Sequence, residues 1–156
     1  MPIANEEIIE YMRRSVLVWL ATADSRNVPN VSPKEMFAYA ENDTLIIAHL
    51  ASPVTVQNIS ENPNVCVSFV DVFVQKGFKL KGKATLIQAP DPLFAKYVGI
   101  LSERFGDRWP IKAIIEVKLA SSARIMAPSY LFFPKTTTEA SQREGAMRSY
   151  GVRPAE

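Results

Sequence analysis

Residues 44–65, TLIIAHLASPVTVQNISENPNV, decide the fold of this chain. They predict an apolar strand over 45–48 that stops at 49–51 and continues as a helix, with Ser52 placed to cap it and Pro53 at its first helical position. The first N–H groups of a helix have no partner within it and carry partial positive charge, so such a junction can hold an anion. The same pattern also describes an ordinary strand-to-helix connection, and the segment alone leaves both interpretations open.

Length and composition describe one globular domain. The chain has 156 residues, 47% of them hydrophobic and 22% charged, which is enough for a core without disulfides. No apolar run approaches the roughly 20 residues of a membrane span, and the N-terminal segment has no apolar signal core. We therefore expect a cytoplasmic protein with no membrane partner.

Cysteine, histidine and net charge narrow the function classes. The single cysteine, Cys66, excludes an internal disulfide, and the single histidine, His49, leaves no histidine pair, so we expect no metal site. His49, at the end of a predicted strand, is a candidate for a polar contact to a ligand, but its interpretation as a turn residue is favoured. A net charge of +2 is too small to favour nucleic acid as a partner.

The chain before residues 44–65 is predicted to form one helix and two strands. Asn5 can cap a helix whose first turn carries two glutamates, the favourable charge at that end. The β-branched and aromatic run over 15–23 predicts a buried strand, and 29–40 predicts another. Pro33 cannot donate a ladder hydrogen bond, so this second strand is interrupted or lies at an edge.

After the helix that begins near Pro53, the sequence predicts three more strands, over 65–74, 77–87 and 112–126, and a helix over 92–105. In GFKLKGKATLI, residues 77–87, apolar and lysine positions alternate strictly, which is typical of a half-buried antiparallel strand. Gly82 within it indicates a bend or a close backbone approach. Most connections are too short for parallel crossovers, so about six strands in an antiparallel barrel fit best.

Three segments carry a resemblance to a known family: VPNVSPKEMF (28–37), HLASPVTVQNISENPNVCVSF (49–69) and GFKLKGKATLI (77–87). In this order and spacing they resemble the pyridoxamine 5'-phosphate oxidase-like family of FMN-binding split barrels, over roughly residues 5–125. The resemblance implies a mainly β (α+β) fold, an about six-stranded antiparallel split β-barrel with a few flanking helices. Residues 1–128 would form the FMN-binding domain, and the tail, 129–156, would pack on the body or on a partner subunit.

The resemblance also implies a cofactor and its surroundings. FMN would be the cofactor, bound near the subunit interface of a homodimer. Ser32, Pro33 and Lys34 would lie along the flavin, with Ser32 or Lys34 near the phosphate or the ribityl chain. Ile47 and Ala48 would sit under the isoalloxazine edge.

The remaining implied contacts centre on the helix that begins near Pro53. Thr55 would meet the phosphate, with Ser52 and the backbone around Val54 nearby. Lys81 is a candidate to approach cofactor or substrate, and Trp109 a candidate to reach the flavin of a second subunit. A plainer interpretation keeps Ser52 and Thr55 as helix-capping residues and the strand lysines as a solvated face.

One departure from the family bears on function. The family often has a basic residue where this chain has Val54, so the phosphate would rest on helix N–H groups, Thr55 and Lys34. The basic phosphate ligands and substrate-binding arginines of the vitamin-pathway oxidase are not visible, and we do not expect that enzyme. The resemblance implies an FMN-dependent oxidoreductase acting on an unidentified small molecule or electron donor, with no catalytic residue assigned. The alternative is a non-catalytic module that binds a flavin or a tetrapyrrole in the same cleft.

Overall fold

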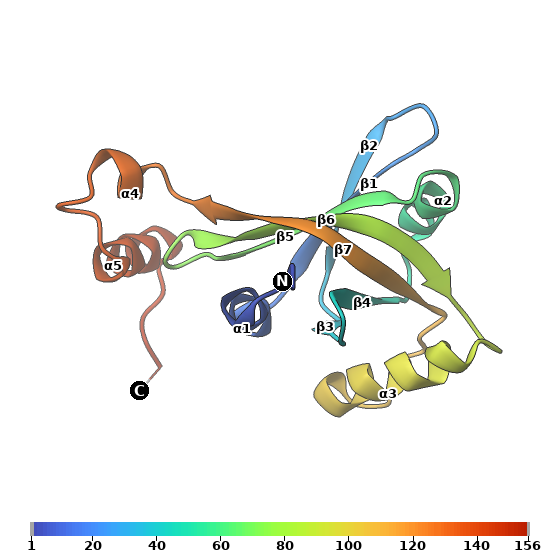
Figure 1. Cartoon of the computed structure of the whole chain (residues 1–156). Helices are drawn as coiled ribbons and strands as arrows, with labels where there is room; N and C mark the ends of the chain where they lie inside the picture. Colours follow the sequence, from blue (N-terminus) through green and yellow to red (C-terminus); the bar gives the residue numbers. More distant parts are fainter. Residues whose placement is uncertain (1, 156) are drawn as a thin grey trace.

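A computed structural model describes residues 2–155. In this part of the chain seven antiparallel strands form one curled sheet, a half-barrel in the order β2-β1-β5-β6-β7-β4-β3, with five helices around it (Figure 1). The strands are β1 Val18–Ala23, β2 Pro29–Lys34, β3 Phe37–Tyr39, β4 Thr44–His49, β5 Asn64–Asp71, β6 Lys76–Ile87 and β7 Ala113–Met126. The helices are α1 Glu6–Arg14, α2 Pro53–Glu61, α3 Pro92–Phe105, α4 Ser129–Phe132 and α5 Glu139–Tyr150. No helix among these residues is long and apolar enough to cross a membrane.

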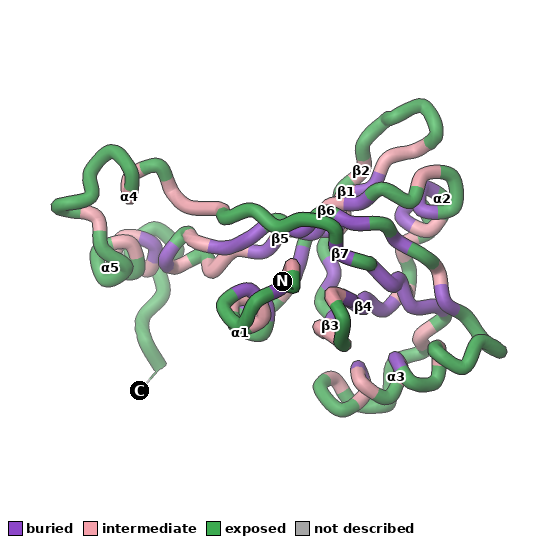
Figure 2. The backbone as a smooth tube through the Cα atoms, viewed as in Figure 1, coloured by how far each residue is buried: buried purple, intermediate pink, exposed green. Residues whose placement is uncertain are grey.

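Two hydrophobic clusters hold the sheet together. The larger one lies inside the curl, where α1 packs on the sheet, and includes the fully buried Leu20, Val67 and Leu80. The smaller one packs α3 against β4 and β7 and includes Ile46 and Leu101. Figure 2 shows the buried residues concentrated where the strands cross, and exposed residues along the far half of β7. The inner face of the sheet is thus buried, whereas the outer face is covered where α3 packs on β4 and β7 and is exposed along the lysines of β6.

The predicted helix starts and the close approach at Gly82 are confirmed. Asn5 accepts a hydrogen bond from the Ile8 N–H at 3.0 Å, and Asp91 accepts one from the Leu93 N–H at 2.9 Å. The register between β6 and β7 shifts at Gly82, where an added Cβ would lie 2.2 Å from the carbonyl oxygen of Lys118. No side chain fits in that space.

The predicted strand over 29–40 is in fact two strands, which is why the sheet has seven and not six. It divides at residues 35–36, and its halves, β2 and β3, lie at opposite edges of the sheet. Pro33 is therefore on an edge strand, one of the two alternatives that its missing N–H predicted. The predicted strand over 65–74 also ends early, because the Asp71 carboxylate accepts the N–H of Phe73 at 3.0 Å and forms a turn.

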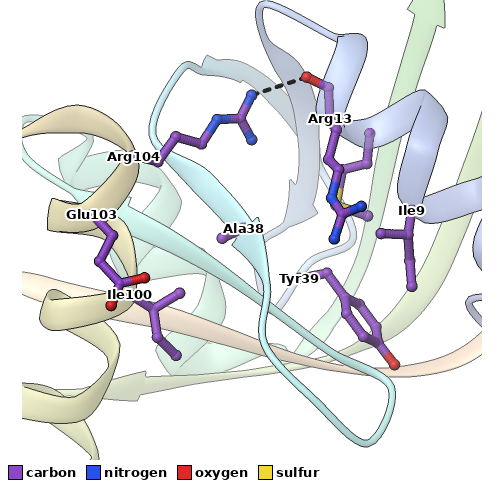
Figure 3. Close-up of a pocket in the computed structure, with 8 residues that line it drawn as sticks. Ile9, Arg13, Ala38, Tyr39, Ile100, Glu103 and Arg104 are labelled. Carbon is purple, nitrogen blue, oxygen red and sulfur yellow. Dashed lines mark hydrogen bonds between the residues drawn. The ribbon is translucent and has the colours of Figure 1, made fainter.

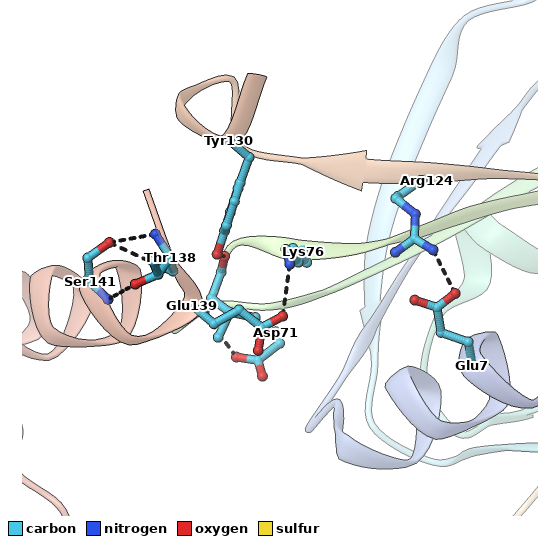
Figure 4. Close-up of polar contacts among 9 residues, drawn as sticks. Glu7, Asp71, Lys76, Arg124, Tyr130, Thr138, Glu139 and Ser141 are labelled. Carbon is cyan, nitrogen blue, oxygen red and sulfur yellow. Dashed lines mark hydrogen bonds and ion pairs between the residues drawn. The ribbon is translucent and has the colours of Figure 1, made fainter. Parts of the chain in front are cut away.

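An arm extends from the body on the long strands β6 and β7, and α4 and α5 lie at its far end (Figure 1). The sequence predicted no helix there. Figure 4 shows the ion pair that Lys76 forms with Glu139, at 2.8 Å. The Tyr130 hydroxyl donates to the Val74 carbonyl at 2.9 Å. Nearer the body, an ion pair of 2.6 Å from Arg124 to Glu7 ties β7 to α1.

Candidate functional site

Lys34, the last residue of β2, is a buried cation. Its strand register places it opposite Val18, on the face of the sheet that carries Leu20, so its side chain turns inward and is only 6% exposed. The ammonium group donates to the hydroxyls of Ser32 at 2.9 Å and Ser52 at 2.5 Å. Within residues 2–155 no carboxylate forms an ion pair with it, and burial lowers the pKa of Lys34. A buried charge without a counter-charge is costly, which makes this corner of the molecule receptive to an anion.

The start of α2 lies directly beside Lys34. Ser52 occupies the N-cap position, but its side chain makes no capping hydrogen bond, because its hydroxyl accepts from the lysine instead. The prediction that Ser52 caps the helix through its side chain was therefore wrong, although Pro53 does take the first helical position. The N–H groups of the first turn have no side-chain cap, and they hold the partial positive charge of the helix dipole next to Lys34.

A buried hydroxyl in the same turn also lacks a partner. Among the described residues, the hydroxyl oxygen of Thr55 is fully buried and makes no hydrogen bond. Buried polar atoms in folded proteins are normally paired, and an unpaired one calls for an explanation such as a bound ligand. One turn further on, Asn58 donates to the buried Thr22 hydroxyl at 3.0 Å and anchors α2 to β1. Asn58 therefore braces the helix and does not face the pocket.

A pocket of about 240 Å³ opens next to this cluster. It is lined by residues from β2, β4, the start of α2 and the loop after α3, among them Pro33, Lys34, Ala48, Ser52 and Trp109. The indole N–H of Trp109 donates to the Phe105 carbonyl at 3.2 Å, which fixes the ring at the rim. The arrangement joins a cationic, donor-rich end to an apolar and aromatic wall, as a phosphorylated aromatic ligand needs.

Comparison with known proteins identifies the family. The sequence profile described as pyridoxamine 5'-phosphate oxidase matches residues 4–141. The chain belongs to this family of FMN-binding split barrels. The match spans β1 to β7 and the start of α5, so it includes every strand that builds the pocket. Among proteins of curated function none matches the chain.

Several solved split-barrel structures have the same fold. HupZ of Group A Streptococcus superposes with a TM-score of 0.67 at 19% identity, over 79% of this chain and 94% of that one. An FMN-binding protein from Syntrophomonas wolfei subsp. wolfei gives 0.64 at 15% identity, over 76% and 86%. HutZ, a heme storage protein from Vibrio cholerae, gives 0.62 at 20% identity, over 81% and 95%. At these identities the likeness shows the fold alone.

Seven of the ten residues that the split-barrel resemblance implied lie at the pocket or in the polar cluster beside it. They are Ser32, Pro33, Lys34, Ala48, Ser52, Thr55 and Trp109. They come from four separate segments of the chain, which the curl of the sheet brings together.

Of the other three residues, Ile47 and Lys81 lie elsewhere. Ile47 is fully buried in the larger cluster, because neighbouring residues of a strand point to opposite faces and Ala48 faces the pocket. The resemblance placed the backbone of Val54, not its side chain, near the phosphate: this backbone is in the first turn of α2 next to Ser52, while the side chain is 53% exposed. Lys81 is exposed, and it follows Leu80, which points into the core, so its side chain is on the opposite face of the sheet from Lys34.

A cation stands beside the helix start although α2 itself has Val54 there. Lys34 of β2 reaches Ser52, so its charge lies next to the first turn of α2 while it is 20 residues away from Val54 along the chain.

His49 does not line the pocket, but it lies close enough to Lys34 for that charge to affect it. Within residues 2–155 its Nδ1 is buried without a hydrogen-bond partner. Burial, and then the charges of Lys34 and Lys112, lower the pKa of His49. A lone histidine at the end of a strand carries no pattern that separates this position from an ordinary turn. No group of three His, Cys, Asp or Glu side chains suited to hold a metal occurs among the described residues.

Proposed function

We propose that the protein binds FMN, with the phosphate at the start of α2. The observation that carries this proposal is the buried Lys34 ammonium, which faces Ser52 beside a helix start with no side-chain cap. Lys34, Ser52 and Thr55 would hold the phosphate together with the N–H groups of the first turn. The Thr55 hydroxyl is unpaired in the same turn, and a shift of this turn that exposes it would let it donate a hydrogen bond to a phosphate oxygen.

The ring system would lie against the apolar part of the pocket. Ala48 and Trp109 line that part, and Pro33 borders it from β2. When bound, the flavin supplies electron-transfer chemistry, and the protein supplies binding and orientation. We infer an oxidoreductase that acts on a small molecule.

We further propose a homodimer that completes this site. The 240 Å³ pocket of one chain is smaller than the roughly 300–1,000 Å³ of typical ligand sites. Pro33 lines the pocket and lies opposite Trp19 of β1 in the strand register. The face of β1 and β2 that carries Trp19 is apolar and exposed, since Trp19 is 45% exposed and Val31 is 59% exposed. A second copy covering this face would extend the wall around the flavin. Sedimentation velocity should show a dimer, and Trp19→Glu should shift it toward monomer; a monomeric wild-type protein would contradict the proposal.

A second candidate function is a binding module without turnover. Two observations favour it: the pocket lining contains one carboxylate, Glu35, and no paired acid and base, and the fold is also that of the heme storage protein HutZ. The ligand would then be a flavin or a tetrapyrrole in the same cleft.

One experiment separates the two candidates. Purified protein is titrated with FMN and with heme while its absorbance spectrum is recorded, and the loaded protein is then mixed anaerobically with NADH or NADPH. Saturable FMN binding followed by bleaching of the flavin band supports the oxidoreductase. FMN binding without bleaching by either donor, or binding of heme in preference to FMN, favours the module. No saturable FMN binding overturns the proposed function.

A further inference from the structure

A second cavity, of about 500 Å³, lies between α1 and α3, far along the sheet order from β1 and β2 (Figure 3). Ile9 and Met12 line it from α1, Ile100 lines it from α3, and β3 forms its floor. Its volume is within the range of small-molecule sites. None of its lining residues belongs to the candidate FMN pocket.

The floor of this cavity offers free backbone groups. β3 is an edge strand, and among residues 2–155 its one partner is β4. Two backbone hydrogen bonds flank β3: the Ala48 N–H donates to the Met36 carbonyl, and the Ala40 N–H donates to the Thr44 carbonyl. The backbone N–H and C=O groups of even-numbered residues in this segment therefore point to β4. By the alternation of an antiparallel ladder, the N–H and C=O of Tyr39 point to the open edge.

Two guanidinium groups from different helices line the same cavity. Arg104 of α3 spans the gap and donates to the Arg13 carbonyl at 3.2 Å (Figure 3). It also donates to the Phe37 carbonyl at 3.4 Å. These bonds use two of its five N–H donors and hold the group in place. The guanidinium of Arg13 turns into the space between the helices, and within residues 2–155 it forms no hydrogen bond or ion pair.

We propose that this cavity binds a small organic monocarboxylate with an apolar body. The carboxylate would lie between Arg13 and Arg104, where the Tyr39 N–H adds a third donor, and the apolar body would lie against Ile9 and Ile100. A planar guanidinium matches the two oxygens of a carboxylate, and fixed donors reduce the ordering cost of binding.

Glu103, on the α3 wall, sets the charge preference of the site. It is the one acidic group that lines the cavity, and two arginines oppose it, so the net charge is +1. A monoanion is thus favoured, whereas a second carboxylate on the ligand would meet repulsion from Glu103.

The test uses hexanoate as the probe and hexanamide as its uncharged match. Amide shifts in ¹⁵N–¹H NMR spectra of the full chain are followed during titration. Hexanoate should give saturable shifts at Ile9, Ala38 and Ile100, and hexanamide should not. Arg13→Met should weaken hexanoate binding about tenfold or more, as expected for the loss of a charge-assisted contact.

Two further variants make the result specific. Arg14→Met removes the neighbouring arginine, which is paired with Glu10 at 2.9 Å, and should leave the hexanoate dissociation constant within about twofold of wild type. Lys34→Met, which acts on the FMN pocket, should also leave it unchanged. The proposal is overturned if hexanoate gives no saturable shifts, if the shifts cluster instead on residues around Lys34, or if Arg13→Met binds hexanoate as wild type does.

Discussion

Replacing Lys34 by methionine should change ligand binding and stability in opposite directions. Methionine keeps an unbranched apolar side chain but removes the ammonium group. In the free protein this group is 6% exposed, burial lowers its pKa, and its partners are two neutral hydroxyls. Its loss therefore relieves a desolvation cost. With FMN bound, the same change removes a cation from the phosphate.

The size of both effects follows from these contacts. A hydrogen bond to a charged group contributes about 1.5–3 kcal/mol, so the dissociation constant for FMN should rise roughly 10- to 150-fold. Without ligand, the free energy of unfolding should stay the same or increase, because Ser32 and Ser52 are both half-buried and their hydroxyls can turn to water.

The assay combines two measurements on one variant. Flavin fluorescence or absorbance gives the dissociation constant, and urea denaturation of ligand-free protein gives the free energy of unfolding. Lys79→Met, at an exposed lysine of β6, is the matched control and should alter neither quantity appreciably. If Lys34→Met destabilises the ligand-free protein while FMN binds as tightly as before, Lys34 is a structural residue and the reasoning is refuted.

Three other changes test separate parts of the account. Thr55→Val removes the unpaired buried hydroxyl, so the free energy of unfolding of the ligand-free protein should stay the same or rise by up to about 1 kcal/mol. The same variant should bind FMN more weakly. Tighter or equal FMN binding in the titration would count against Thr55 as a phosphate contact. Gly82→Ala places a Cβ 2.2 Å from the Lys118 carbonyl and should lower the free energy of unfolding in urea by at least about 1–3 kcal/mol; a neutral result would contradict the close approach. Because the pKa of His49 is lowered on folding, the unfolded chain binds its proton more readily below about pH 6.5, and the free energy of unfolding should fall as pH drops through and below that value. His49→Gln should remove this part of the pH dependence, and an unchanged profile would show that other groups cause it.

Local patterns were enough to predict most of the barrel. The alternation in residues 77–87 gave β6, and Ser52-Pro53 and Asp91-Pro92 marked where α2 and α3 begin. The division between β2 and β3 was not predictable in the same way. Residues 29–40 contain a strand pattern throughout, and only the curl of the sheet sends its halves to opposite edges.

The C-terminal helices show a different limit. α5 buries only Ala146 among its described residues, so it has no apolar stripe that a periodicity argument could find. Its start depends on a reciprocal bond pair between Thr138 and Ser141, a variant of the capping box with serine in place of glutamate or glutamine. Its position depends on the Lys76–Glu139 ion pair, a contact across 63 residues.

The resemblance to the split-barrel family named residues that lie together in the candidate site, but not their contacts with one another. The sequence placed Ser52 as a capping residue, and the resemblance placed Lys34 near the phosphate or the ribityl chain. The structure shows that each satisfies the other, which leaves the helix start open. Such a pairing depends on how β2 is placed against α2 in three dimensions, and spacing along the chain does not encode it.

The most direct test of the central claim compares FMN with riboflavin, which lacks the phosphate. Both dissociation constants are measured for wild-type protein and for Lys34→Met under the same salt conditions. If Lys34 and the start of α2 hold the phosphate, wild type should bind FMN at least about tenfold more tightly than riboflavin, and Lys34→Met should lose most of that preference while its riboflavin affinity is unchanged. Equal binding of FMN and riboflavin by wild-type protein would contradict a phosphate site at this helix start.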